Sequence, residues 1–137
     1  MRTVEEAKAL LAEKNATCVV FGKEEHIYFD RGVRPLLSAL SDGYLKDALV
    51  CDKVIGKSAA MILVAGGIAK LHTRLVSTHA RKYLDAHGID YSFDAECPYI
   101  INRAGDGMCP MEATVLDIDD AESGVAALRE KLKSMQK

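Results

Sequence analysis

The chain has 137 residues, of which 49% are hydrophobic and 28% charged, and its formal net charge is −2. These values are typical of one globular domain and exclude a disordered chain, and no basic stripe indicates a nucleic-acid partner. The amphipathic N-terminus lacks the apolar core of a secretion signal, and the apolar run 59–68 is about half the length of a membrane span. We therefore expect one domain over residues 1–137, cytoplasmic, without a membrane or nucleic-acid partner.

The first half of the chain predicts a helix, a hairpin and two more helices. A helix is expected over 3–14, where Thr3 and Glu6 form a capping box. Strands are expected at 17–22 and 26–30, and a short helix within 31–43. A long, almost wholly apolar helix is then expected from Asp52, its N-cap, to Gly66 and Gly67.

The second half alternates strands and helices. We expect a strand at 68–75, a helix from its cap Ser77 to Gly88, a strand at 89–94 and a short helix after Cys109. A last helix is expected over 119–135, with a capping box of Asp119 and Glu122. This order of elements predicts a three-layer α/β/α sandwich around a mixed sheet.

Four cysteines are spread along the chain and none forms a CxxC pair: Cys18, Cys51, Cys97 and Cys109. In a cytoplasmic protein this spacing favours four free thiols over disulfides or a metal site.

Three stretches, RGVRPLL (31–37), DKVIGKSAA (52–60) and INRAGDGMCPME (101–112), together resemble the uncharacterised family called domain of unknown function 1893. The resemblance covers nearly the whole chain and implies a cytidine-deaminase-like fold. It implies no activity, because no activity is attached to the family. Fold alone does not fix function.

The zinc chemistry of deaminases can be tested on the sequence. Those enzymes need an H-x-E pattern at the start of the buried helix and P-C-x-x-C at the start of the next one. Here the two positions read IGKSAA and VSTHARKY, without the zinc ligands or the catalytic glutamate. The sequence therefore argues against zinc-dependent deamination, and we expect no metal and no cofactor.

Lys57 is the first candidate for chemistry. A lysine in a buried helix can meet phosphate or carboxylate, and desolvation lowers its pKa so that it can act as a base or nucleophile. The pair Lys57–Ser58 is similar to one in the transformylase domain of purine biosynthesis, which shares the implied fold. The alternative is that Lys57, with Lys53 on the same helical face, simply reaches water.

The second candidate is the stretch INRAGDGMCPMEATV (101–115). Gly105 and Gly107 can adopt positive φ, so that backbone N–H groups form an anion nest, and Arg103 can hold an anion. Cys109 falls at a helix N-cap, where the thiolate is favoured, and Asn102 offers an amide. The alternative is an ordinary capped turn in which Glu112 caps its own helix and the thiol is inert.

We therefore expect a protein that binds a nucleotide-like or other anionic metabolite between the Asp52 helix and the 102–112 loop. Any catalysis would be metal-free and use Lys57 or Cys109. The alternatives are a non-catalytic regulatory or binding module and a thiol-redox role for Cys109. Two-fold dimers are common, so a homodimer is compatible with the sequence. The expected ligand-binding residues are Asp52, Ser58, Asn102, Arg103, Gly105, Gly107, Met111 and Glu112.

Overall fold

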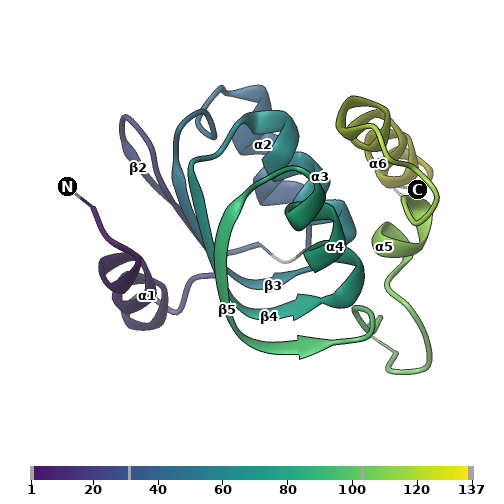
Figure 1. The fold of residues 1–137 in the computed structure, drawn as a ribbon, viewed down its shortest axis with the longest axis horizontal. Helices are drawn as coiled ribbons and strands as arrows, with labels where there is room; N and C mark the ends of the chain where they lie inside the picture. Colours follow the sequence, from purple (N-terminus) through teal and green to yellow (C-terminus); the bar gives the residue numbers. More distant parts are fainter. Residues whose placement is uncertain (1, 31, 103, 136–137) are drawn as a thin grey trace.

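The computed structural model describes residues 2–30, 32–102 and 104–135 and contains a five-stranded mixed sheet of order β2-β1-β3-β4-β5 (Figure 1). Strand β1 is antiparallel to both of its neighbours, whereas β3, β4 and β5 are parallel. The strands are β1 (Cys18–Phe21), β2 (Glu25–Tyr28), β3 (Leu49–Ile55), β4 (Lys70–Ser77) and β5 (Asp90–Cys97).

Helices cover both faces of this sheet. Helix α1 packs on one face, whereas α2, α3 and α4 pack on the other. Helices α5 and α6 contact α3 on its side away from α1, at the right of Figure 1. This confirms the α/β class and the mixed sheet that the order of elements predicted. The helices are α1 (Val4–Glu13), α2 (Arg34–Ser41), α3 (Lys57–Gly66), α4 (Thr78–Ala86), α5 (Pro110–Thr114) and α6 (Ala121–Met135).

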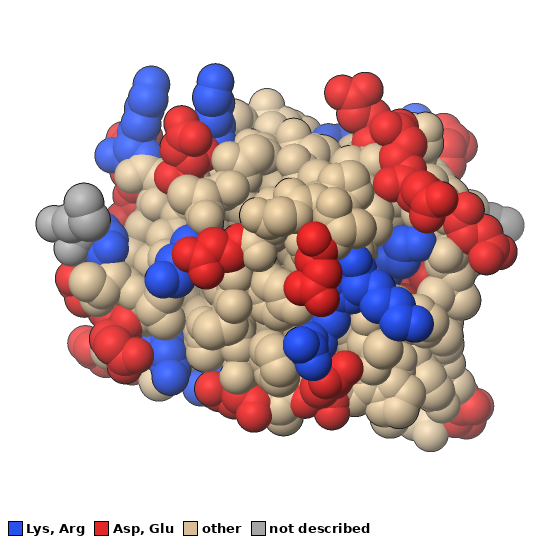
Figure 2. All heavy atoms as spheres, viewed as in Figure 1, with Lys and Arg blue, Asp and Glu red and all other residues tan. Residues whose placement is uncertain are grey.

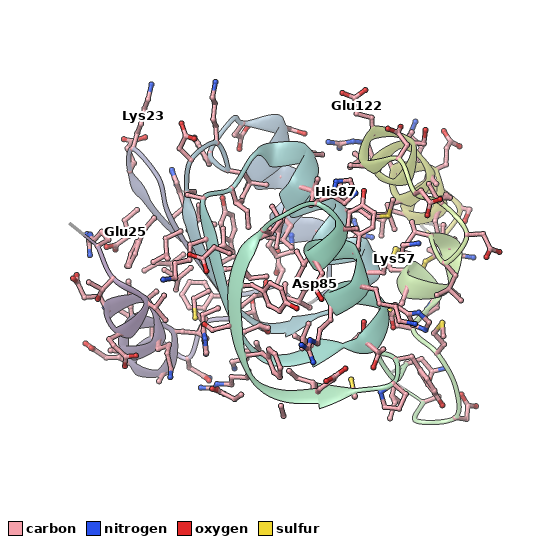
Figure 3. The ribbon with its side chains drawn as sticks, in the orientation of Figure 1. Lys23, Glu25, Lys57, Asp85, His87 and Glu122 are labelled. Atoms are coloured by element: carbon pink, nitrogen blue, oxygen red, sulfur yellow. The ribbon has the colours of Figure 1, made fainter. Side chains whose placement is uncertain are left out.

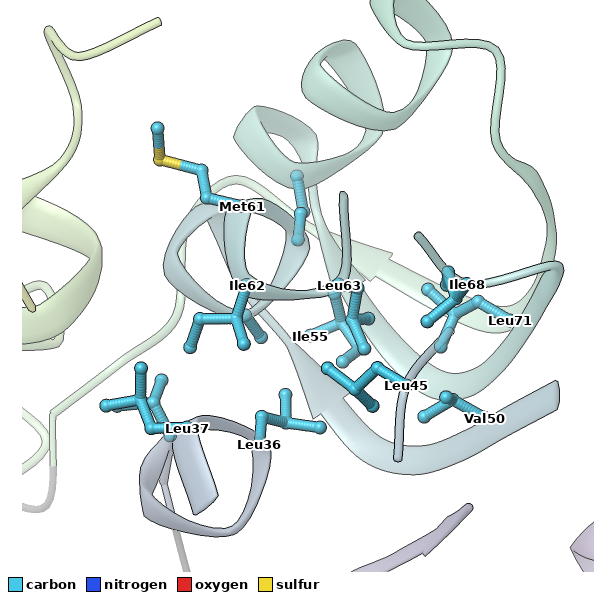
Figure 4. Packing of buried hydrophobic residues seen from close by; sticks show 14 of the residues in the cluster. Leu36, Leu37, Leu45, Val50, Ile55, Met61, Ile62, Leu63, Ile68 and Leu71 are labelled. Carbon is cyan, nitrogen blue, oxygen red and sulfur yellow. The ribbon is translucent and has the colours of Figure 1, made fainter. Parts of the chain in front are cut away.

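The two faces of the sheet have separate cores because strand residues alternate between faces. Val19 packs against α1 in the smaller core, and its neighbour Val20 belongs to the larger core on the opposite face. Helix α3 is the centre of the larger core, as its apolar sequence predicted, and its Met61 and Leu63 are fully buried (Figure 4).

In β3 and β4, the alternation of side chains between the two faces of the sheet shifts by one residue near the carboxyl end of each strand. Val50 and Ile55 both lie in the larger core although they are five residues apart, an odd spacing that a regular strand would place on opposite faces. Asp52 Oδ1 accepts a hydrogen bond from Val54 N–H at 3.2 Å, and the hydroxyl of its register partner Thr73 donates to Leu75 O at 3.1 Å. These side-chain bonds mark the level at which the alternation shifts.

The predicted helix start at Asp52 was wrong. Residues 49–55 form β3, and α3 begins only at Lys57, with Gly56 as its N-cap. An interior parallel strand is buried on both faces, so its run of apolar residues merges with that of the following helix. The predicted C-terminal end was right, because Gly67 ends α3 in the left-handed conformation.

The capping box expected at Asp119 was also wrong by one residue. Asp120 Oδ2 accepts from the Ser123 N–H at 2.9 Å and from its hydroxyl at 2.8 Å, and α6 begins at Ala121. The caps expected at Thr3 and Ser77 are present. Over the described part of the chain, no helix has the length and apolar character needed to cross a membrane.

Candidate functional site

Helices α3 and α4 both begin at the carboxyl edge of the parallel strands, since each directly follows its strand, β3 or β4. Ser77 caps α4, because its hydroxyl oxygen accepts from the Ala80 N–H at 3.0 Å. Gly56 caps α3 without a side chain, which leaves the first N–H groups of that helix to find a partner elsewhere.

That partner is Glu112 of α5, which is only 1% exposed. Its Oε2 accepts from the Lys57 N–H at 2.7 Å and from the Ser77 hydroxyl at 2.5 Å, and its Oε1 accepts from the Ile100 N–H at 2.6 Å. One buried carboxylate therefore joins the starts of α3 and α4 to the segment after β5. The expectation that Glu112 caps its own helix was wrong.

The approach of these segments requires a glycine at position 56. A Cβ there would lie 2.8 Å from Ile100 Cγ1 and 3.0 Å from Glu112 Oε2, inside normal contact distances. The bare backbone of Gly56 thus allows the carboxylate to reach the start of α3.

Lys57 is buried, with an exposed fraction of 7%, and does not reach water as the alternative interpretation supposed. Its Nζ donates to Leu116 O at 2.8 Å, just beyond the end of α5, and lies 5.8 Å from the centre of the Tyr83 ring (Figure 3). Lys53 does not share its helical face, because it belongs to β3. Lys57 therefore meets the α5 segment twice, through Glu112 with its N–H and through Leu116 with its amine.

The side chain of Asn102 makes its hydrogen bonds within its own turn. Asn102 Oδ1 accepts from the N–H groups of Gly105 at 2.8 Å and Asp106 at 3.2 Å, and Asn102 Nδ2 donates to Asp106 Oδ1 at 2.9 Å. Gly105 has φ +77°, as predicted, whereas Gly107 does not adopt a positive φ. Arg103 lies outside the described residues. In this conformation the amide oxygen of Asn102 occupies the predicted nest.

Cys109 is the N-cap of α5, as predicted, and is half-buried. Its side chain makes no capping hydrogen bond, and its N–H donates to Ile100 O at 2.7 Å. Cys109 and Lys57 Nζ thus meet α5 at its opposite ends. Met111 is buried in the larger core.

Asp52 and Ser58 are both buried, but they differ in position. Ser58 follows Lys57 in the first turn of α3, whereas Asp52 faces Cys18 across β1 and β3. Burial raises the pKa of Asp52 from 3.8 to about 7 against the opposing hydrogen bonds from Val54 and Cys18. The structure therefore brings Lys57, Ser58 and Glu112 together and leaves Asp52 in the sheet.

Sequence reasoning missed two donors of this cluster. Ser77 was predicted only as a cap, and Ile100 was not singled out, because a backbone N–H carries no signal in the sequence. Among the described residues, no group of three His, Cys, Asp or Glu side chains is placed to hold a metal ion.

Fold and site define a small α/β domain with a mixed sheet and a buried carboxylate at the carboxyl edge of its parallel strands. The family model for the domain of unknown function DUF1893 matches residues 6–132, so the chain belongs to this family. A DUF1893 family protein from Thermotoga maritima has a similar structure, with a TM-score of 0.87 and 25% sequence identity over 93% of this chain and 88% of that chain. No curated protein matches the chain.

Proposed function

We propose that this protein binds a small anionic, nucleotide-like metabolite in a cytidine-deaminase-like domain that works without zinc. The site is the carboxyl edge of β3 and β4, where the two helices begin. The observation that carries the proposal is the carboxylate of Glu112, which is fully buried and held by three donors from three separate segments.

Those donors suit an oxyanion of any origin. The start of a helix favours negative charge, and ligands of open α/β sheets commonly bind outside the carboxyl ends of the strands. In the described conformation Glu112 supplies this negative charge from within the chain. A phosphate or carboxylate of the ligand would take the same donors, and α5, only five residues long, would move away with Glu112.

The segment before α5 offers contacts for the rest of such a ligand. Tyr99 and Ile101 expose 37% and 61% of their surfaces, on either side of Ile100, whose N–H donates to Glu112. An aromatic and an aliphatic side chain there can cover a base or sugar ring. Any reaction at this site would use Lys57 or Cys109, the groups that meet the two ends of α5.

The proposal is tested by NMR titration with nucleoside monophosphates, nucleoside diphosphates and phosphosugars, together with a thermal-shift measurement. We expect one of these compounds to raise the melting temperature and to shift the amide signals of Lys57 and Ile100, because their N–H groups exchange Glu112 for the ligand. If none of the compounds shifts these two amides, the proposal fails.

A pair of cap variants provides the matched control. Ser77→Ala removes a cap and a ligand donor, whereas Thr3→Ala removes only a cap, since Thr3 accepts from the Glu6 N–H far from the site. We expect Ser77→Ala to weaken binding about tenfold and Thr3→Ala to leave it unchanged. Equal affinities in the two variants would contradict the assignment of Ser77 as a donor to the ligand.

A further inference from the structure

A pocket lies beside α1, on the face of the sheet opposite to Glu112. It is lined by Lys8 and Leu11 of α1, Cys51 of β3, His72 and Arg74 of β4 and Asp94 of β5, and its volume is about 180 Å³. The main contacts of helix α1 with the sheet are to β1 and β3, and the residues of β4 and β5 that line the pocket lie beyond these two strands.

His72 forms the floor of this pocket. Cys51, His72 and Ser92 are register neighbours on three parallel strands, so their side chains share one face. His72 is 5% exposed, and its Nδ1 lies 2.7 Å from the Ser92 hydroxyl. When that hydroxyl donates to Nδ1, the imidazole carries its hydrogen on Nε2 and can donate it to an acceptor.

The Nε2 atom of His72 is enclosed and has no hydrogen-bond partner among the described residues. The nearest acceptor is Asp94 Oδ1 at 3.5 Å, which is too long for a good hydrogen bond, and the Asp94 side chain is half-exposed. Buried polar atoms are nearly always paired, so an unpaired Nε2 on a residue that lines a pocket indicates a partner from outside the chain. Such a partner would reach this enclosed atom once the half-exposed Asp94 side chain moves aside.

The charge of the pocket favours an anion. Lys8 and Arg74 line it with two positive charges against the one carboxylate of Asp94. Burial and then the Asp52 carboxylate raise the pKa of the Cys51 thiol to about 11, Lys8 and Arg74 act in the opposite direction, and Asp94 adds to the rise. A metal ion does not fit, because the described residues include no group of three suitable ligands.

The volume limits the ligand to a small one. A water molecule takes about 30 Å³ in the liquid, so the pocket has room for roughly six waters. Sites for drug-sized ligands start at about 300 Å³. We infer that this pocket binds a small oxyanion, either a phosphate group or a short carboxylate, with His72 Nε2–H donating at the floor and Lys8 and Arg74 at the wall.

Titration with inorganic phosphate, sulfate and acetate, followed by NMR of the histidine side chains at constant ionic strength, tests this inference. We expect at least one anion to shift the His72 Nε2–H signal in a saturable way. Stronger binding of phosphate would identify a phosphate site, and stronger binding of acetate a carboxylate site. If no anion shifts this signal, the inference is overturned.

Two substitutions on one strand separate the pocket from general charge effects. Arg74→Gln removes a positive charge from the pocket, whereas Lys70→Gln removes one from the same strand outside it, where Lys70 pairs with Asp90. We expect Arg74→Gln to weaken anion binding about tenfold and Lys70→Gln to leave it unchanged. Equal weakening by both would overturn the inference, and because Glu112 lies on the other face, either outcome leaves the proposed function to its own test.

Discussion

Asp52 gives the stability of this protein a pH dependence of its own. The raised pKa of about 7 means that the folded chain keeps the Asp52 proton at acidities where the unfolded chain has lost it. Stability due to this group is therefore greatest below pH about 4 and falls as the pH rises towards about 7. The physical cause is the cost of holding an ionised carboxylate beside Cys18, between the sheet and the larger core.

We expect Asp52→Asn to remove this dependence, because an amide does not ionise and its oxygen still accepts from the Val54 N–H. Urea unfolding at about pH 5 and about pH 8 measures it. Relative to the unsubstituted protein, the variant should gain roughly 2–3 kcal/mol of unfolding free energy between these two pH values. An equal difference in unfolding free energy between the variant and the unsubstituted protein at both pH values would show that Asp52 ionises normally in the folded state.

Residue types in the sequence singled out individual residues of the cluster but not which of them are in contact. The sequence favoured Lys57 and Glu112 as site residues, and they are in contact, but they lie 55 positions apart and nothing local to either indicates the other. Asn102 was predicted to offer its amide to a ligand, and that role stays a prediction. That its oxygen closes its own turn depends on backbone geometry, which the sequence does not state.

Two glycines determine how closely the elements around α3 pack. A Cβ on Gly66 would lie 2.6 Å from both Cβ and Cδ1 of Leu45, which is held in the core. A Cβ on Gly124 of α6 would run into Met61 Cε and lie 2.7 Å from Met61 Sδ. The first obstacle includes an atom fixed to the backbone, whereas the second is the end of a flexible side chain.

We therefore expect Gly66→Ala to lower the free energy of unfolding by about 2–3 kcal/mol and Gly124→Ala by about 1 kcal/mol or less. Both substitutions add one methyl group at a helical glycine, so each serves as the control for the other. Only Gly124 lies inside its helix, where alanine also gains helix propensity, whereas Gly66 is the last residue of α3. Urea unfolding of the two variants provides the measurement. If Gly124→Ala lowers the free energy of unfolding more than Gly66→Ala does, the Met61 side chain does not move aside for the added methyl group.

Among the elements, those with local signals were predicted and one without them was missed. Thr3, Ser77 and Gly67 mark helix ends through their own chemistry, and the structure has helix ends at all three. Strand β3 carries no turn between itself and α3, only Gly56. Its place in the sheet is decided by pairing with β1 and β4, which are distant in the sequence.

At the scale of the whole molecule, the strands differ in how well neighbouring elements protect them from local opening. Strands β3 and β4 have a partner strand on both sides, whereas β2 and β5 are edges, and α1 covers only part of one face. Acidic and basic side chains are interspersed on the face drawn in Figure 2. Elements with fewer partners open more readily than those in the middle of a sheet.

Hydrogen exchange measures this difference between register partners. The amides of Leu71 and Thr73 in β4 should exchange only with global unfolding, and those of their β5 partners Tyr91 and Phe93 should exchange faster. Equal rates in the two strands would mean that β5 opens only together with the centre of the sheet.

The buried carboxylate also has a consequence for a shortened chain. All five strands and the helices α1 to α4 precede Glu112 in the sequence and end at Cys97. A chain that ended at Cys97 would hold every residue of the sheet, but the Lys57 N–H and the Ser77 hydroxyl would have only water in place of Glu112.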